Sequence, residues 1–170
     1  MEFAFYHAQR RAGLPPSSGS MLPHILDSVR EDGQPLETGW PYLAAVPADV
    51  SKWGPPTITE KYRRASDHNS GSFSEIVSHI TAGSPPVLLF LLGERFYIPD
   101  RNGMIRSAAG EVDVAGHAVV AVATGRNNEG NWLLVRNSWG ATWGIGGHAW
   151  VSEDYMANRL RWIAVLKERL

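Results

Sequence analysis

Two apolar runs in the second half of the chain most constrain its fold, because together they predict a β-hairpin. Residues 116–123 and 131–137 are rich in valine, alanine and leucine, and the segment 124–130 between them is rich in glycine and asparagine. Such a segment between two β-prone runs favours a tight antiparallel connection. The hairpin would carry His117 near the start of its first strand and Asn137 at the end of its second.

The remaining elements predict an α+β fold. Helical spacing of apolar residues indicates helices first, and β-prone runs follow them. The proline-rich stretch 34–59 predicts an extended crossover between the two regions, and the polar segment 61–70 predicts a loop. We expect helices at 2–12, 21–31 and 73–82, and further strands at 87–92, 147–152 and 161–167. The continuous apolar strand 87–92 is expected to be buried on both faces.

Composition excludes several classes of function. The 170 residues are 44% hydrophobic and 19% charged, with a net charge of −1, so no overall field recruits nucleic acid or an anionic membrane. The longest apolar run, Val87 to Leu92, is too short to cross a bilayer. No secretory signal opens the sequence, so a cytoplasmic location is the default expectation. The sequence contains no cysteine, which excludes disulfides and thiol chemistry by its own residues.

The histidine and the asparagine of the hairpin predict half of a nucleophilic site. A histidine beside a side chain that orients its ring is the base-and-orienter arrangement that activates a serine or cysteine. Trp139 and Trp143 follow Asn137 closely and would support the pair. A lone histidine in an apolar strand is more often a core residue, and only the surrounding motif favours catalysis. Ser20 and its neighbouring serines lie in a turn that explains their presence without a nucleophilic role.

Several segments together resemble the papain-like cysteine peptidase family, in particular its bacterial and archaeal relatives. They are Gly19, Trp40-Pro41-Tyr42, Pro86-Val87, Gly116-His117-Ala118-Val119, Asn137-Ser138-Trp139-Gly140, Trp143-Gly144 and Gly146-Gly147. Any one of these segments alone would be a weak signal, whereas their order and combination are specific. The resemblance covers nearly the whole chain.

The resemblance implies a catalytic histidine and asparagine, His117 and Asn137, with Trp139 and Trp143 supporting them. It implies substrate-binding residues at Gly19, Ser20, Met21, Ala115 and Gly116. It also implies peptide-bond hydrolysis on a peptide or protein substrate, without a metal or organic cofactor. The family nucleophile lies about 130 to 150 residues before the histidine, which is upstream of Met1. The oxyanion glutamine is expected to be absent together with that cysteine.

The resemblance further implies two lobes. We expect a partial helical lobe over residues 1–45 and an antiparallel β-barrel lobe over residues 46–170, which carries the histidine and the asparagine. A helix that begins at residue 2 without a capping residue suggests that a segment preceding it has been lost.

Three hypotheses of function stay open on the sequence. The first is a truncated, catalytically incomplete cysteine peptidase domain that regains activity when a segment bearing the cysteine is supplied. The second is a pseudoenzyme that binds peptides without cleaving them. The third is an assembly module whose uncovered apolar face, with Phe3, Phe5 and Tyr6, binds a chain carrying the missing helix or a second copy.

Overall fold

The computed structural model divides into two compact units. It describes residues 2–41, 43, 45, 47 and 49–167. The first unit comprises residues 1–66 with the C-terminal residues from Lys167, and the second comprises residues 67–166. The predicted lobe boundary between residues 45 and 46 stays a prediction. In the part of the chain that is described, no helix is long and apolar enough to cross a membrane.

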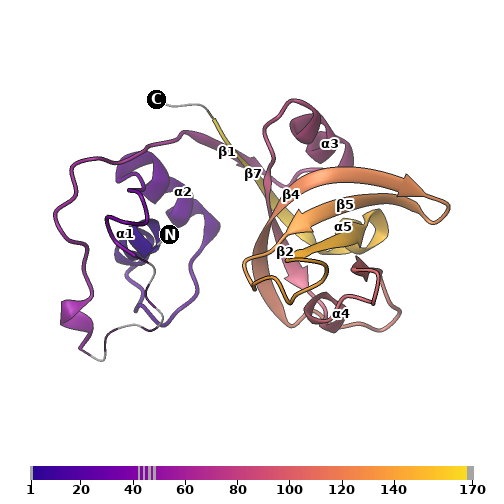
Figure 1. Cartoon of the computed structure of the whole chain (residues 1–170), viewed down its shortest axis with the longest axis horizontal. Helices are drawn as coiled ribbons and strands as arrows, with labels where there is room; N and C mark the ends of the chain where they lie inside the picture. The colour runs from indigo at the N-terminus through magenta and orange to yellow at the C-terminus, as the bar shows by residue number, and fades with distance from the viewer. Residues whose placement is uncertain (1, 42, 44, 46, 48, 168–170) are drawn as a thin grey trace. The chain divides into compact units, whose positions relative to one another are not determined.

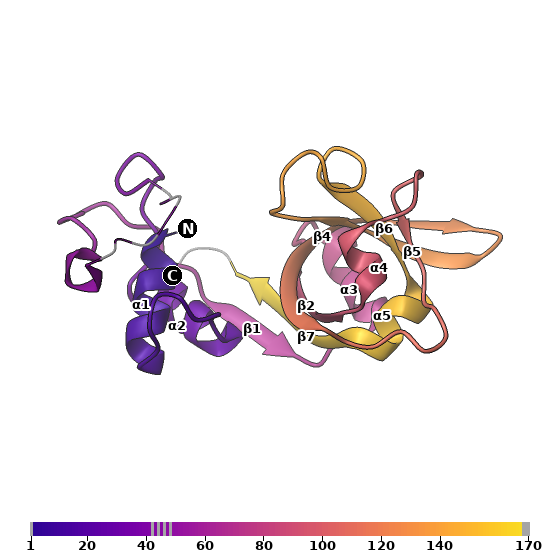
Figure 2. The same cartoon turned by 90° about the horizontal axis from the view of Figure 1, so that it is seen from below.

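The first unit is built on two packed helices. Helices α1 (Glu2–Ala12) and α2 (Leu22–Glu31) lie side by side, as Figure 2 shows, and a short 3-10 helix η1 (Val50–Lys52) follows. The bounds agree with the predicted helices within one residue. The proline-rich crossover folds back on α1, so that Trp40 and Trp53 pack with Phe3 in a small aromatic core. Tyr42 of the predicted aromatic crossover lies outside the described residues.

One buried pair fixes this aromatic core. The indole N–H of Trp53 donates to the carboxylate of Glu2 at 2.9 Å, and both side chains are buried. The sequence predicts that Phe3 and Tyr6 are exposed if a helix is missing. In the structure both instead pack against Trp40, and Tyr6 also packs against Trp53. The crossover therefore covers the apolar side of α1 that the sequence left without a partner.

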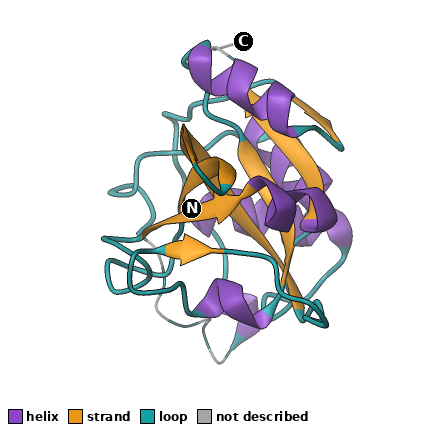
Figure 3. Cartoon of the chain, turned by 90° about the vertical axis from the view of Figure 1, so that its right-hand side faces the viewer, coloured by secondary structure: helices purple, strands orange, loops and turns teal. Residues whose placement is uncertain are grey.

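The second unit contains a seven-stranded sheet and three short helices. Its strands are β1 (Ser66–Asn69), β2 (Val87–Leu92), β3 (Met104–Ile105), β4 (Ala115–Asn127), β5 (Gly130–Arg136), β6 (His148–Ser152) and β7 (Leu160–Leu166). The helices are α3 (Phe73–Thr81), α4 (Glu94–Tyr97) and α5 (Glu153–Arg159). Figure 1 shows β4 and β5 as a long hairpin, and Figure 3 shows the loops that join the strands.

The strand order is β1-β7-β2-β4-β5-β6-β3, so the pairing is open and does not close into a barrel. The pairs of β2 with β7, β2 with β4, β4 with β5 and β5 with β6 are antiparallel, whereas β3 runs parallel to β6. The predicted α+β class is confirmed, with a mixed, open sheet in place of the expected antiparallel barrel. The short strand β3 follows a turn at Asp100. Two residues are too few for the sequence to predict the direction of a strand.

The core of the second unit lies against one face of β2. Leu88, Phe90 and Leu92 are fully buried, whereas the alternate residues of this strand are only partly buried. The prediction that β2 is buried on both faces was therefore wrong. The outer-face residues of β2 are also apolar, so the apolar run is continuous in the sequence although that face is only partly buried. Strand β1 was missed because its residues Ser66–Asn69 are polar.

We expect Phe90→Ala to destabilise the chain by about 3 to 5 kcal/mol, because it opens a cavity in a close-packed core. Phe90 is 0% exposed and lies on β2 between two paired strands. Urea unfolding followed by circular dichroism measures the free energy of unfolding. Val112→Ala is the matched control, since Val112 is 73% exposed. A loss of less than about 1 kcal/mol in Phe90→Ala would contradict the assigned core.

A half-buried histidine, His7, makes the first unit sensitive to acid. His7 contacts Asp32 at 3.4 Å and packs against the rings of Phe3 and Tyr6. Burial lowers the pKa of His7 below its usual value, and the opposing attraction of Asp32 does not offset it. The folded state therefore prefers neutral His7. The unfolded chain binds this proton more readily, so protonation below a pH of about 6.5 favours unfolding.

We expect the free energy of unfolding to fall as the pH is lowered from 7 through the depressed pKa of His7. His7→Gln keeps a polar side chain that does not titrate, and it should flatten this part of the profile. Urea unfolding at closely spaced pH values measures the slope. His24→Gln on α2 is the control and should keep the wild-type slope. Equal slopes in wild type and His7→Gln would rule out this origin.

Candidate active site

The hairpin of β4 and β5 places His117 and Asn137 together. Register pairs Val120 with Arg136, so one further step along both strands sets Asn137 opposite Val119. His117 is then the diagonal neighbour of Asn137 on the same face, a spacing that long polar side chains bridge. The structure joins the two: His117 Nε2 and Asn137 Oδ1 lie 2.7 Å apart. Asn137 is buried and His117 is half-buried.

A backbone contact fixes the orientation of the Asn137 amide. The N–H of Ser138 donates to Asn137 Oδ1 at 2.7 Å, so this atom is the amide oxygen, an acceptor. His117 Nε2 therefore carries a hydrogen and donates it to the same oxygen. In the neutral ring, Nδ1 keeps its lone pair. Nδ1 has no hydrogen-bond partner within the described chain, and it is the nitrogen free to accept a proton.

Aromatic rings cover this hydrogen bond. The Trp139 ring lies 4.6 Å from the His117 ring, tilted by 33°. Phe96, which is fully buried, meets Trp139 edge-on at 5.9 Å and His117 at 6.3 Å. Because apolar rings exclude water, the electrostatic attraction between the imidazole and the amide is stronger than in solvent. Trp139 thus contacts the histidine ring directly, and its supporting role stays a prediction.

Trp143, for which a supporting role stays a prediction, lies one layer further in. Its buried indole N–H donates to the carbonyl of Phe96 at 2.9 Å, and its ring meets Trp139 edge-on at 6.0 Å. The turn that follows requires a glycine at Gly144, which has φ +57°. A Cβ at this position would overlap the carbonyl of His148. The glycines after the tryptophans therefore let the loop turn tightly into β6.

The predicted substrate-binding residues fall in both units. Ala115 and Gly116 are exposed residues at the start of β4, next to His117. Gly19, Ser20 and Met21 lie in the first unit, just before α2. A Cβ on Gly19 would meet no atom within 4 Å, and Met21 is 59% exposed. The substrate-binding role of all five residues stays a prediction.

Sequence reasoning missed two parts of this site. Phe96 and Tyr97 belong to α4, which no motif marked, and they reach Trp139 only through the tertiary fold. The asparagine motif includes Ser138, but the sequence does not predict that the backbone N–H of Ser138 orients the Asn137 amide. Two surface cavities of about 310 and 330 Å³ lie around Trp150, and neither is lined by His117 or Asn137. Among the described residues, no cluster of three or more His, Asp or Glu side chains could hold a metal ion.

The sequence profile described as papain family cysteine protease matches residues 18–161. This chain belongs to the papain family. The papain-family domain is 28% identical over 126 residues to papaya proteinase 4 of Carica papaya, covering 72% of this chain and 34% of that protein. It is also 31% identical over 85 residues to a cysteine protease of Blomia tropicalis, covering 49% of this chain and 26% of the relative. The papain-family domain thus spans about a third or less of the length of these two relatives.

Solved structures show the same fold. Xylellain, a cysteine protease of Xylella fastidiosa, matches the papain-family domain with a TM-score of 0.71 at 22% identity, over 98% of this chain and 68% of that one. A procathepsin B of Trypanosoma congolense matches with a TM-score of 0.73 at 18% identity, over 96% of this chain and 59% of that one. The papain-like α+β fold predicted from the sequence is confirmed.

Asn137→Ala should destabilise the papain-family domain by about 1 to 3 kcal/mol, because two donors lose their acceptor. These are the ring Nε2–H of His117 and the backbone N–H of Ser138. The histidine should also populate its other tautomer, with the hydrogen on Nδ1, which nitrogen-15 NMR measures directly. Asn102→Ala, at an exposed asparagine, is the matched control. An unchanged tautomer in Asn137→Ala would show that Asn137 does not orient the ring.

Proposed function

We propose that this domain supplies the proton-transfer half of a papain-like cysteine peptidase site. The thiol nucleophile and an oxyanion glutamine would come from a segment that is not among these 170 residues. The single observation that carries the proposal is the oriented pair of His117 Nε2 and Asn137 Oδ1 at 2.7 Å in a sequence without cysteine. Base and orienter without a nucleophile cannot complete acyl transfer, so the 170 residues alone are expected to hydrolyse no peptide.

In the complete site, His117 would move one proton in each direction. Its free Nδ1 accepts the proton of the thiol, and the thiolate forms a bond to the scissile carbonyl carbon. When the C–N bond breaks, the imidazolium returns the proton to the leaving amine and a thioester stays on the sulfur. Water then attacks the thioester with His117 again as the base, which releases the acid and restores the thiol. Asn137 keeps the ring aligned throughout, because it holds the nitrogen that does not react.

The substrate of such a site is an extended peptide. Gly116 carries no side chain, and a Cβ there would come no closer than 4.0 Å to Phe90, so the backbone beside His117 is open. Gly19 is likewise open, which suits the approach of a peptide backbone in the first unit. We assign Gly19, Ser20, Met21, Ala115 and Gly116 to peptide binding in this proposal.

A second candidate function is binding without cleavage, as a pseudoenzyme or an assembly module. The observation that favours it is the His117–Asn137 pair beside the open backbone of Gly116 in a sequence that has no cysteine. A site that keeps its geometry without a nucleophile can hold an extended peptide but cannot cleave it.

We expect the 170-residue chain to leave fluorogenic peptides intact and to gain activity when it is refolded with a segment bearing the glutamine and a cysteine that opens a helix. The activity should require both the cysteine and His117, so His117→Ala in the reconstituted protein should be inactive. The measurement is the initial rate of peptide hydrolysis. The histidine His148 has no role in the mechanism, and His148→Gln is the matched control.

The outcomes separate the two candidate functions. Hydrolysis by the 170 residues alone would contradict the proposal. A reconstituted protein that stays inactive but binds an extended peptide saturably in calorimetry would favour the pseudoenzyme. Light scattering over a range of concentrations tests the assembly module, and a strictly monomeric chain that binds no peptide would exclude both forms of the second candidate.

A further inference from the structure

The cover over the hydrogen bond depends on a loop residue, Trp139. Trp139 lies outside regular secondary structure and is 37% exposed. Its described contacts are with aromatic rings: His117, Phe96, Trp143 and Tyr97. Two of these, Phe96 and Trp143, meet it edge-on and at right angles or nearly so. Edge contacts hold the rim of an indole but leave its faces free to tilt.

Tyr97 makes the most nearly parallel of the four ring contacts of Trp139. Its ring stacks on Trp139 at 5.2 Å with an angle of 17° between the planes. Tyr97 is 43% exposed, so burial in the core does not explain its position. Tyr97 and His117 each contact Trp139, but no ring contact joins them to one another in the described structure. The ring of Tyr97 therefore reaches the histidine through the indole, whereas its chain neighbour Phe96 contacts the His117 ring directly.

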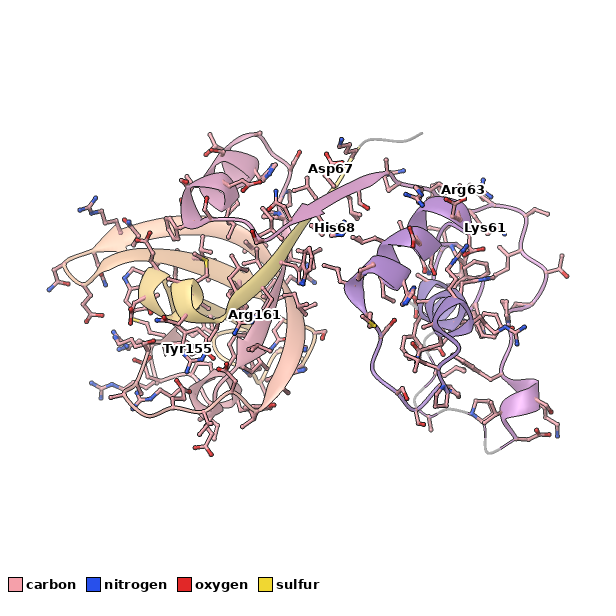
Figure 4. All side chains as sticks on the ribbon, turned by 180° about the vertical axis from the view of Figure 1, so that it is seen from behind. Lys61, Arg63, Asp67, His68, Tyr155 and Arg161 are labelled. Carbon is pink, nitrogen blue, oxygen red and sulfur yellow. The ribbon has the colours of Figure 1, made fainter. Side chains whose placement is uncertain are left out.

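The segment that carries Tyr97 is firmly anchored. The N–H of Gly93 donates to the hydroxyl of Tyr155 at 2.9 Å, and the N–H of Arg95 donates to the carboxylate of Glu111 at 2.9 Å. Burial raises the pKa of Tyr155, so its hydroxyl stays neutral. Glu111 in turn pairs with buried Arg159 at 3.1 Å. Figure 4 labels Tyr155 on α5, at the start of this chain of contacts.

Glycine at position 93 is what lets this anchor form. A Cβ on Gly93 would overlap the carboxylate of Glu111. With no side chain there, Glu111 lies against the backbone at the start of α4 and reaches the N–H of Arg95. The backbone of α4 is thus held from the core side, independently of the Tyr97 ring. Removal of that ring should therefore change the cover of the site without moving the helix.

We propose that Tyr97 is a positioning residue of the candidate active site: by stacking on Trp139 it keeps the indole over the His117–Asn137 hydrogen bond and keeps water from it. The inference deepens the proposed function, on which it rests for the role of His117 as a base. Its physical consequence is independent of catalysis. Without the stack, the indole tilts, water reaches the shared hydrogen, and Nε2–H exchanges faster with solvent.

The test uses the 170-residue chain, which needs no nucleophile for this measurement. Nitrogen-15 NMR follows the exchange rate of His117 Nε2–H and the tautomer of the ring. Tyr97→Ala should exchange about tenfold faster than wild type, the scale expected for loss of one aromatic stack. Tyr97→Phe keeps the ring and should match wild type. Ile98→Ala is the matched control, because Ile98 is 83% exposed, adjacent to Tyr97 and makes no ring contact.

Two results would overturn the proposal. One is a Tyr97→Ala chain with wild-type exchange, which would show that Trp139 keeps its place unaided. The other is faster exchange in Ile98→Ala of the same size, which would point to general loosening of α4. Thermal unfolding of each variant confirms that the fold is retained, and Tyr97→Leu repeats the test with a larger side chain. Failure of peptide hydrolysis in the reconstituted protein would bear on the proposed function and leave this measurement unaffected.

Discussion

The bond between His117 Nε2 and Asn137 Oδ1 organises the second unit, because the elements around it serve to place, orient or cover it. The hairpin of β4 and β5 sets the two residues as diagonal neighbours, and the Ser138 N–H fixes which amide atom faces the ring. One hydrogen bond contributes only about 0.5 to 1.5 kcal/mol to folding. The main effect of this hydrogen bond is on the tautomer of His117, since it assigns the hydrogen to Nε2 and leaves Nδ1 as the acceptor.

The aromatic layer connects this bond to the hydrophobic core. Phe96 is the link: it packs in the core, contacts the His117 and Trp139 rings, and accepts the indole N–H of Trp143 at its carbonyl. Substitutions in the core near α4 are therefore expected to change the positions of the His117 and Trp139 rings through their contacts with Phe96. Tyr97 differs from Phe96 in burial, because Tyr97 is 43% exposed and contacts the aromatic layer through its stack on Trp139.

Membership of the papain family accounts for the oriented histidine and asparagine, and the absence of cysteine from these 170 residues sets what they can do alone. Proton transfer requires only a base with a free lone pair, which His117 has. Covalent catalysis requires a nucleophile within reach of that base, and no side chain of this chain provides the thiol. The proposed function, the acid–base part of a cysteine peptidase site, therefore requires a sulfur from outside these 170 residues.

The sequence alone determined the hairpin, the helices α1 to α3 within about a residue, the family, and the pairing of His117 with Asn137, because these depend on local periodicity and on a specific motif. Tertiary structure decided what no local pattern encodes. The polar strand β1 and the two-residue β3 form only through pairing with β7 and β6, and the sheet stays open because the pairing has two free ends. Phe96 and Tyr97 reach Trp139 from about 40 residues earlier in the sequence. The anchors of their helix, Tyr155 and Glu111, lie 62 and 16 residues from the backbone groups that they bind. Contacts between residues so far apart depend on the packed core, and that is why the cover of the site had to be read from the fold.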